Sequence, residues 1–446
     1  MLAAGGSAAD SAVAMILAGS VAETIFCGLG GGGFATYYEA ATRTVTCLDF
    51  FVGVPGLDGT VPDPPRDISV FFGSVAVPYA VGGSSVAVPG VPAGTAEMHR
   101  RFGVLPWRDV VAPAHALAAD GVEFSAAHAQ LLPEIAPAML LGAGAEIYTT
   151  PDGEGGRRLL RAGDTIAHPG LADTFAELAA DGPATLITGE IGRALVKAVR
   201  ADGGALSMQD MAAYRVAELP PRRVPFGPGL LHVRGNDLDA FADTAAALDL
   251  AAVRRGGIDR ARTFVQALRA PARRSETTSV VAVDAWGNAC AATHSLGLGS
   301  GVWVEGVHGN SMLGEGELLR GELVPGARMA SMMVPSVITD PAGALLAAGG
   351  AAGGSRIRPA LLQVLAGVLA QGMTAAEAVA APRMSVTPEL VHLEPGFPDE
   401  VVEALLADGE ELVRWPAPRP YFGGVAAIAA DGPAADFRRG GLALTL

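Results

Sequence analysis

Residues 273–288 read Arg-Arg-Ser-Glu-Thr-Thr-Ser-Val-Val-Ala-Val-Asp-Ala-Trp-Gly-Asn. A basic segment leads into two threonines, and an apolar run closed by Asp-x-x-Gly-Asn follows. This order predicts a linker, a buried strand and a turn. A threonine at a chain N-terminus carries its own general base, the free α-amine. We therefore hypothesise that the bond between Glu276 and Thr277 is cleaved and that Thr277 becomes a nucleophile. The alternative is an ordinary threonine at a strand edge.

The composition describes an acidic chain with a large apolar fraction. The 446 residues are 50% hydrophobic, which is enough for a large core, and 31 basic against 46 acidic residues give a net charge of -15. Such a charge argues against a nucleic-acid or anionic-membrane partner. The N-terminus has no basic region ahead of its apolar segment, so a soluble cytoplasmic protein is expected.

The cysteines favour neither a disulfide framework nor a metal site. Cys27, Cys47 and Cys290 are odd in number and widely spaced in apolar surroundings, so they are expected to be small core residues. No metal and no cofactor are expected. His294 and His308 are candidate bases, but a threonine that carries its own amine needs neither.

A glycine-rich segment follows the first expected helix, residues 8–25. Residues 28–33 formally contain the G-x-G-x-x-G pattern of dinucleotide sites, but that pattern needs a strand before it and a helix after it. Here a helix precedes, and a hairpin with strands at 34–38 and 45–50 is expected to follow. Close backbone packing, where only glycine fits, is the favoured interpretation.

The remaining pattern separates a helix-rich first part from a strand-rich second part. In the first part we expect helices at 94–102, 107–120, 170–181, 189–201, 207–214, 243–255 and 262–269. After Thr277 we expect consecutive antiparallel strands at 279–284, 289–295, 301–304, 334–339 and 344–348. A glycine turn at 349–356 then opens a helix at 359–371. Backbone N–H groups at such a turn can hold developing negative charge.

Several short motifs, taken in chain order, resemble the γ-glutamyltransferase family of N-terminal-nucleophile enzymes over nearly the whole chain. Each motif is weak by itself, but together and in order they are specific. The matching residues are Gly30-Gly31-Gly32-Gly33-Phe34, Leu48-Asp49-Phe50, Val88-Pro89-Gly90, Thr277-Thr278 to Asp284 with Gly287-Asn288, Arg328, Ser331, Pro335, Gly353-Gly354-Ser355-Arg356, Ala381-Pro382-Arg383 and Arg438-Arg439-Gly440-Gly441.

The resemblance implies an α+β fold, the αββα four-layer sandwich of N-terminal-nucleophile hydrolases. It implies a precursor that cleaves itself into a large subunit, residues 1–276, and a small subunit, residues 277–446, which remain one fold. Thr277 would be the nucleophile of an acyl-enzyme mechanism, supported by Thr278 and Ser295. The backbone at Gly353 and Gly354 would form the oxyanion hole. The implied substrate is a small acyl or amino-acid-derived molecule.

The chain departs from the family at the positions that would hold the head group of a glutamyl substrate. Phe51 stands where an arginine is expected, Gly297 replaces an asparagine, and the aspartate position falls near Gly314. Each missing charge-assisted contact is worth roughly 1.5–3 kcal/mol, so glutathione is not the expected substrate. Met332 replaces the second serine of a paired-serine segment, and Glu315 is a candidate replacement contact. The candidate substrate-binding residues are therefore Phe51, Ser331, Met332 and Glu315.

Three other functions stay open. Some divergent members of the family serve actinobacterial pathways to alkylproline antibiotics, where hydrolysis of a C–C bond is the implied reaction; the high alanine and glycine content fits such a host. A γ-glutamyl hydrolase or transferase with a rebuilt site is the second alternative. An unprocessed homologue that binds without catalysis is the third.

Overall fold

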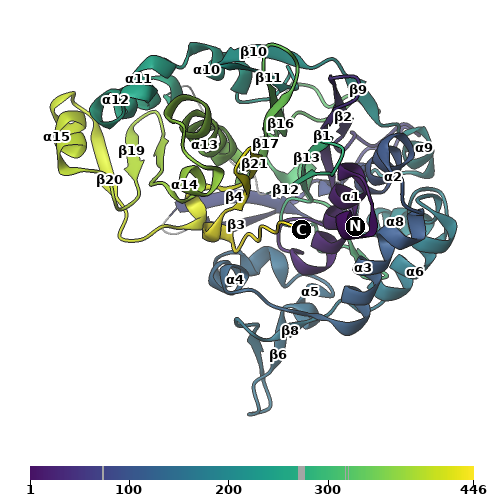
Figure 1. Ribbon diagram of the computed structural model, residues 1–446. Helices are drawn as coiled ribbons and strands as arrows, with labels where there is room; N and C mark the ends of the chain where they lie inside the picture. The colour runs from purple at the N-terminus through teal and green to yellow at the C-terminus, as the bar shows by residue number, and fades with distance from the viewer. Residues whose placement is uncertain (73–74, 270–276, 317, 320) are drawn as a thin grey trace.

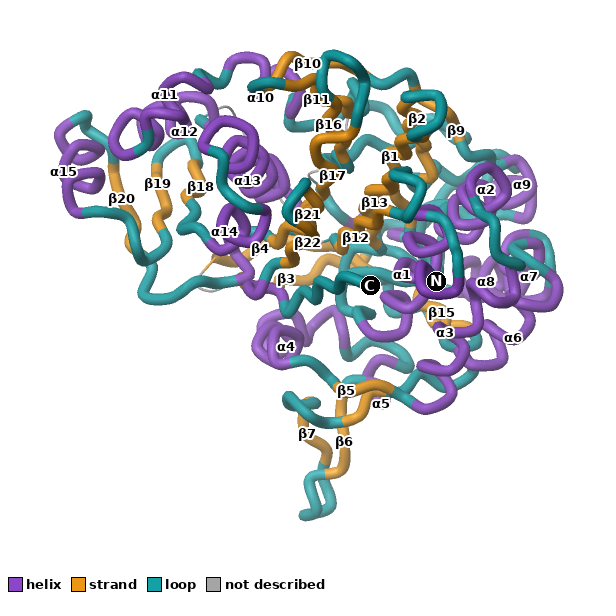
Figure 2. Tube along the Cα trace, in the orientation of Figure 1, coloured by secondary structure: helices purple, strands orange, loops and turns teal. Residues whose placement is uncertain are grey.

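The computed structural model describes residues 1–72, 75–269, 277–316, 318, 319 and 321–446 (Figure 1). Helices and strands are mixed along the chain, and the expected α+β class is confirmed (Figure 2). In the described part of the chain, none of the helices combines the length and the apolar composition that a membrane span needs.

The first of two central sheets combines strands from distant parts of the chain. Its order is β12-β13-β1-β2-β9, and every neighbouring pair is antiparallel. The strands are β1 (Gly32–Glu39), β2 (Thr44–Phe50), β9 (Ala217–Leu219), β12 (Thr278–Val283) and β13 (Ala289–Ser295). The strand after the glycine run therefore pairs with the hairpin after Thr277.

The second sheet has the order β10-β11-β16-β17-β21-β22 and is also antiparallel. Its strands are β10 (Arg222–Phe226), β11 (Gly229–Val233), β16 (Ser336–Thr339), β17 (Leu345–Ala352), β21 (Gly424–Ala429) and β22 (Gly432–Ala435). β17 and β21 contact β12 of the first sheet, and β17 also contacts β13. The two sheets therefore meet around the hairpin that follows Thr277.

Helices contact both sheets, and Figure 1 shows them gathered on either side of the strands. α1 (Ala8–Ala22) contacts β12 and β13, whereas α13 (Ile357–Gln371) contacts β17 and β21. The helices on the α1 side are α2 (Val91–Phe102), α3 (Trp107–Asp120), α6 (Leu171–Asp181), α7 (Ala184–Ile187), α8 (Glu190–Ala201) and α9 (Met208–Ala213). Those on the α13 side are α10 (Phe241–Ala247), α11 (Leu250–Arg255), α12 (Gly257–Leu268), α14 (Ala375–Ala380) and α15 (Asp399–Ala407).

Smaller elements surround this body. α4 (Ala126–Met139) packs on a long hairpin, and the hairpin of β6 and β7 projects from the body at the bottom of Figure 2. Two-stranded pairs are β3 (Arg66–Phe72) with β4 (Val75–Val81), β5 (Val122–Glu123) with β8 (Thr165–Ile166), β6 (Thr149–Pro151) with β7 (Arg157–Leu159), and β14 (Trp303–Val304) with β15 (Val307–His308). A three-stranded sheet contains β18 (Met384–Val386), β19 (Leu390–Leu393) and β20 (Glu411–Arg414), and α5 (Gly144–Ile147) precedes β6.

The structure moves one predicted turn. The glycine turn was expected at 349–356, but β17 continues to Ala352 because residues 347–352 pair with β21. The strand expected at 344–348 is therefore too short. The turn is confined to Gly353 and the 3-10 helix η4 (Gly354–Arg356), from which α13 begins.

α1 is fixed at its start by two carboxylates. Ser7 and Asp10 form a capping box, in which Ser7 N donates to Asp10 Oδ2 (2.9 Å) and Asp10 N donates to Ser7 Oγ (3.1 Å). Ala8 N donates to Asp284 Oδ2 (2.9 Å) in the turn between β12 and β13. Asp284 Oδ1 also accepts the N–H groups of Trp286 and Asn288, both at 3.0 Å. Asp284 therefore shapes the Asp-x-x-Gly-Asn turn and holds α1 against the hairpin.

The glycine run packs against backbone, as predicted. An added methyl group at Gly30 would lie 2.1 Å from the carbonyl oxygen of His308, and one at Gly31 would lie 2.1 Å from that of Ser295. These distances leave no room for any side chain. The close approach sets β1 beside β13, and the dinucleotide interpretation finds no support in the order of elements.

Asp284→Ala removes the acceptor shared by α1 and the β12–β13 turn. We expect the free energy of unfolding to fall by about 3 kcal/mol, because one buried and two partly buried N–H groups lose a charged partner. Asp340→Ala is the matched control: Asp340 Oδ1 accepts Ala344 N (2.8 Å) in an exposed turn, and a loss of about 1 kcal/mol is expected. Urea denaturation of both variants provides the measurement. Equal losses would contradict the linking role of Asp284.

Candidate active site

Thr277 lies where the two sheets meet. It precedes β12, and its side chain is 1% exposed. Gly353 N donates to Thr277 Oγ1 at 2.8 Å. The hydroxyl predicted to act as a nucleophile therefore accepts an N–H of the turn predicted to stabilise an oxyanion. Glu276, the other residue of the predicted cleavage site, lies outside the described residues.

The Gly353 turn has a backbone that favours glycine. Gly353 has φ +121°, a region that side chains disfavour, and its carbonyl accepts Arg356 N at 2.9 Å. An added methyl group at Gly353 would lie 3.1 Å from both Gly423 Cα and Arg439 Nη2. Gly354 is the first residue of η4, directly before α13. The turn is therefore held between β21 and the C-terminal segment.

Ser295 lies at the same end of the hairpin as Thr277. Thr278 pairs with His294 across β12 and β13. Because these strands are antiparallel, Ser295, which follows His294, lies beside Thr277, which precedes Thr278. Ser295 is fully buried, and its Oγ accepts Gly297 N at 2.9 Å. Thr277, Thr278, Ser295 and Gly353 are thus brought together, while their chemical roles stay predictions.

Thr278 makes a contact that sequence reasoning missed. Its hydroxyl donates to Glu23 Oε2 at 2.7 Å, and Glu23 is the C-cap of α1. Burial raises the pKa of Glu23, while the hydrogen bond from Thr278 and the positive charge of Arg439 lower it. An acid at the C-terminal end of a helix opposes the helix dipole, and this local mismatch is the sequence signal that could have identified Glu23.

Both candidate histidines are neutral and buried. Burial lowers the pKa of His294 to about 4, and neither ring nitrogen has a hydrogen-bond partner among the described residues. Burial and the neighbouring His168 lower the pKa of His308 to about 3, and His308 Nε2 accepts Gly301 N at 3.0 Å. An imidazole whose pKa lies this low is a poor general base near neutral pH.

Phe51 and Met332 lie in the hydrophobic core. Phe51 is 1% exposed and stacks on Phe34 with ring centroids 5.5 Å apart, and Met332 belongs to the same cluster. Ser331 is also buried, and its Oγ accepts Met333 N at 3.2 Å. A core position explains the apolar side chains of Phe51 and Met332. The contact of all three residues with substrate stays a prediction.

Glu315 belongs to a buried polar cluster under the loop that follows Ser295. Tyr79, on β4, donates its hydroxyl to Glu315 Oε1 (2.9 Å) and lies 2.6 Å from Ser311 Oγ. An added methyl group at Gly297, which has φ +72°, would lie 2.5–2.6 Å from these three side chains. The cluster therefore occupies the space that a side chain at position 297 would need.

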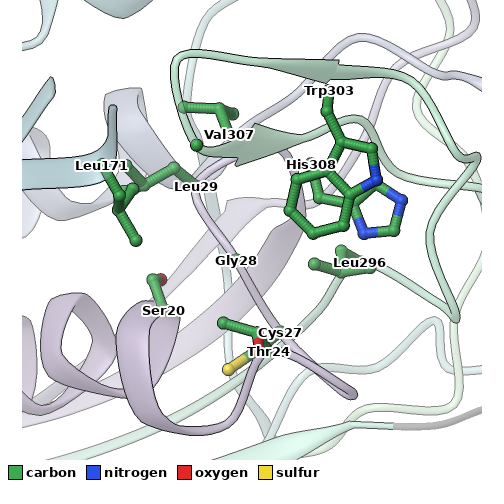
Figure 3. Close-up of a pocket in the computed structure, with 11 residues that line it drawn as sticks. Ser20, Thr24, Cys27, Gly28, Leu29, Leu171, Leu296, Trp303, Val307 and His308 are labelled. Carbon is green, nitrogen blue, oxygen red and sulfur yellow. The ribbon is translucent and has the colours of Figure 1, made fainter. Parts of the chain in front are cut away.

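A pocket lies beside this region, at the end of α1 (Figure 3). Ser20 of α1 and Thr24, in the turn after α1, face the hairpin of β14 and β15, where the rings of Trp303 and His308 stack with centroids 3.8 Å apart. The remaining residues that line it are Cys27, Gly28, Leu29, Leu171, Leu296, Gly306 and Val307. Thr277 does not line this pocket. Two of its lining residues, Thr24 and Leu296, directly follow Glu23 and Ser295 in the sequence.

The described residues contain no group of three histidine, cysteine or acidic side chains placed to hold a metal ion. Cys27, Cys47 and Cys290 are free and buried, as expected for small core residues. The polar groups described next to Thr277 are the Gly353 N–H and the Thr278 hydroxyl, which in turn contacts the Glu23 carboxylate.

The chain is similar to known proteins over most of its length. A family model described as Gamma-glutamyltranspeptidase matches residues 1–236 and 230–445. The Acylase ACY 1 proenzyme of Pseudomonas sp. (strain V22) is 27% identical over 495 residues, covering 96% of this chain and 87% of the relative. The Glutathione hydrolase 5 proenzyme of Rattus norvegicus is 27% identical over 523 residues, covering 98% and 88%.

Solved structures with a similar fold cover nearly the whole chain. The cephalosporin acylase from Bacillus halodurans superposes with a TM-score of 0.79, covering 99% of this chain and 92% of the other, at 21% sequence identity. Similarity at this level of identity shows a shared fold.

Gly353→Ala tests the close packing of the turn. We expect a loss of about 2 kcal/mol in the free energy of unfolding, because the backbone conformation is strained for alanine and the methyl group contacts Gly423 and Arg439. Gly372→Ala is the control: Gly372 has φ +69° with no atom within 4 Å of an added methyl group, so only about 1 kcal/mol is expected. Chemical denaturation compares the two variants. An equal loss in both would show that the close approach at Gly353 has no cost.

Proposed function

Since the chain belongs to the gamma-glutamyltranspeptidase family, we propose that it cleaves itself before Thr277 and then acts as an N-terminal-threonine hydrolase. It is a γ-glutamyltransferase-like hydrolase or acyltransferase. The observation that carries the proposal is the hydrogen bond from Gly353 N to Thr277 Oγ1, 2.8 Å long, in a buried position. The bond joins the proposed nucleophile, just before β12, to a proposed oxyanion donor, just after β17 of the other sheet.

In the proposed reaction, the α-amine of Thr277 takes the hydroxyl proton as Oγ1 attacks the carbonyl carbon of an amide. The carbonyl oxygen becomes an oxyanion, for which the N–H groups of Gly353 and Gly354 are the proposed donors. The amine then passes its proton to the leaving nitrogen, and the C–N bond breaks. Water attacks the resulting ester of Thr277, releases a carboxylic acid and regenerates the hydroxyl.

The proposed subunits are residues 1–276 and 277–446, in one αββα four-layer fold. Support comes from the strand pairing, because β12 and β13 of the second part pair with β1 of the first part. The proposed layers are supported by the contacts of α1 with β12 and β13, of these strands with β17, and of β17 with α13.

The acyl donor is proposed to lack the charged head group of glutamate. Phe51 and Met332 are buried in the core, where an ionic contact to a head group is not available from these side chains. At Gly314, an added methyl group would lie 1.8 Å from the carbonyl oxygen of Ala80, so an aspartate does not fit the present backbone. Two of the relatives compared above are named acylases, which is compatible with an amide substrate of this kind.

Thr277→Ala is expected to leave a single uncut chain on a denaturing gel, because the attacking hydroxyl is gone. Thr277→Ser should still cleave, since serine keeps the hydroxyl. Thr42→Ala, an exposed threonine in the turn between β1 and β2, is the control and should cleave normally. Cleavage of Thr277→Ala at the wild-type rate would end the proposal.

Substrate preference is tested with three p-nitroanilides, carrying γ-glutamyl, glutaryl or pentanoyl groups. We expect kcat/KM for the γ-glutamyl compound to be no higher than for the other two, because contacts to its α-amine and carboxylate are missing. Each such contact would favour it about tenfold or more. A γ-glutamyl preference of about a hundredfold would contradict the proposed substrate class and support true γ-glutamyl transfer.

A further inference from the structure

Glu23 stands in a position that its own helix disfavours. It is the C-cap of α1, where the partial negative charge of the helix opposes a carboxylate. Departures from local preference of this kind are expected at functional sites. The compensating contact comes from outside the helix, because Thr278 Oγ1 donates to Glu23 Oε2 at 2.7 Å. Glu23 therefore contacts the residue next to the proposed new chain end, Thr277.

Arg439 approaches the same residues from the C-terminal 3-10 helix η6 (Phe437–Arg439). Its Nη2 lies 3.1 Å from the position of a methyl group at Gly353, whose N–H contacts Thr277 Oγ1. The guanidinium carbon lies 5.0 Å from the centre of the Phe26 ring, three residues beyond Glu23. The positive charge is close enough to Glu23 to oppose the effect of burial on its pKa.

Among the described residues, the other titratable groups near Thr277 are neutral or have partners of their own. Burial lowers the pKa values of His128 and His294 to about 4, and burial raises the pKa of the Cys27 thiol well above its usual range. Arg356, in η4, lies over the ring of Tyr421 at 4.2 Å and donates to Ser355 Oγ at 2.9 Å. In the part of the chain that the structure describes, Glu23 accepts a hydrogen bond from Thr278, and the guanidinium of Arg439 lies close to the Gly353 turn. Two side chains of opposite charge therefore lie near Thr277.

We propose that Glu23 and Arg439 are positioning residues that tune the basicity of the Thr277 amine in opposite directions. The inference rests on the proposed function, because the amine exists only in a cleaved chain. A nearby carboxylate stabilises the ammonium form of an amine, whereas a nearby guanidinium destabilises it. The pair sets the fraction of amine that is free to accept the hydroxyl proton, and it holds Thr278 and Gly353 in place around that amine.

The sequence offers a direct way to measure this amine. Lys197 is the one lysine of the chain, and residues 277–446 contain none. After cleavage, any amine methylation of the 277–446 fragment by formaldehyde and cyanoborohydride therefore reports on Thr277. The rate follows the unprotonated fraction, so the mass of the fragment, followed over a pH series, gives the pKa of the amine without a substrate.

The expected shifts have opposite signs. Glu23→Gln, which keeps an acceptor for Thr278, should lower the pKa of the Thr277 amine by about one unit, and Arg439→Gln should raise it by about one unit. Arg439→Lys keeps the charge and should restore the wild-type value. Glu154→Gln and Arg108→Gln change exposed charges elsewhere and should leave it unchanged. Thermal unfolding of each variant checks that the fold is retained.

The outcomes separate this inference from the proposed function. A chain that never yields the 277–446 fragment refutes self-cleavage, and the inference falls with it. A cleaved chain in which Glu23→Gln and Arg439→Gln leave the amine pKa unchanged, or shift it in the same direction, overturns the inference alone.

Discussion

The backbones of Gly30 and Gly31 lie so close to the carbonyl oxygens of His308 and Ser295 that no side chain fits between them. This contact brings the start of β1 against the end of β13. β12 pairs with β13 at the edge of this sheet, and Thr277 directly precedes β12. β17 of the second sheet contacts both strands, so the turn at Gly353, which follows β17, lies next to Thr277. The position of the Thr277 hydroxyl between the two sheets therefore depends on a few glycines whose backbone packs directly against the backbone of another segment.

The sequence predicted those strands, helices and turns that are determined by residues close together in the chain. The strands at 279–284 and 289–295 correspond to β12 and β13, and the glycine run packs as expected. The helix expected at 243–255 is instead two helices, because Asp249 accepts the N–H groups of Ala251 and Ala252 and starts a second one. The three-stranded sheet of β18, β19 and β20 was not predicted, since its pairing joins segments that no short pattern links.

The candidate site shows the same limit. The setting of Thr277 was readable from the residues around it, and the motif containing Gly353 was readable from a family pattern. The bond between them spans 76 positions, and the bond from Thr278 to Glu23 spans 255, so neither follows from spacing. Glu23 carried one local signal, an acid at the wrong end of a helix, but its partner is visible only in the folded chain.

One sheet contains strands from both residues 1–276 and residues 277–446, and this affects how the two parts could separate. Ala8 and Asp284 are 276 positions apart yet hydrogen-bonded, and β1 pairs with β13 along its length. If the chain is cut before Thr277, the same strand pairs hold each half folded and hold the two halves together. Dilution would then not release one half from the other, because dissociation and unfolding would be a single event.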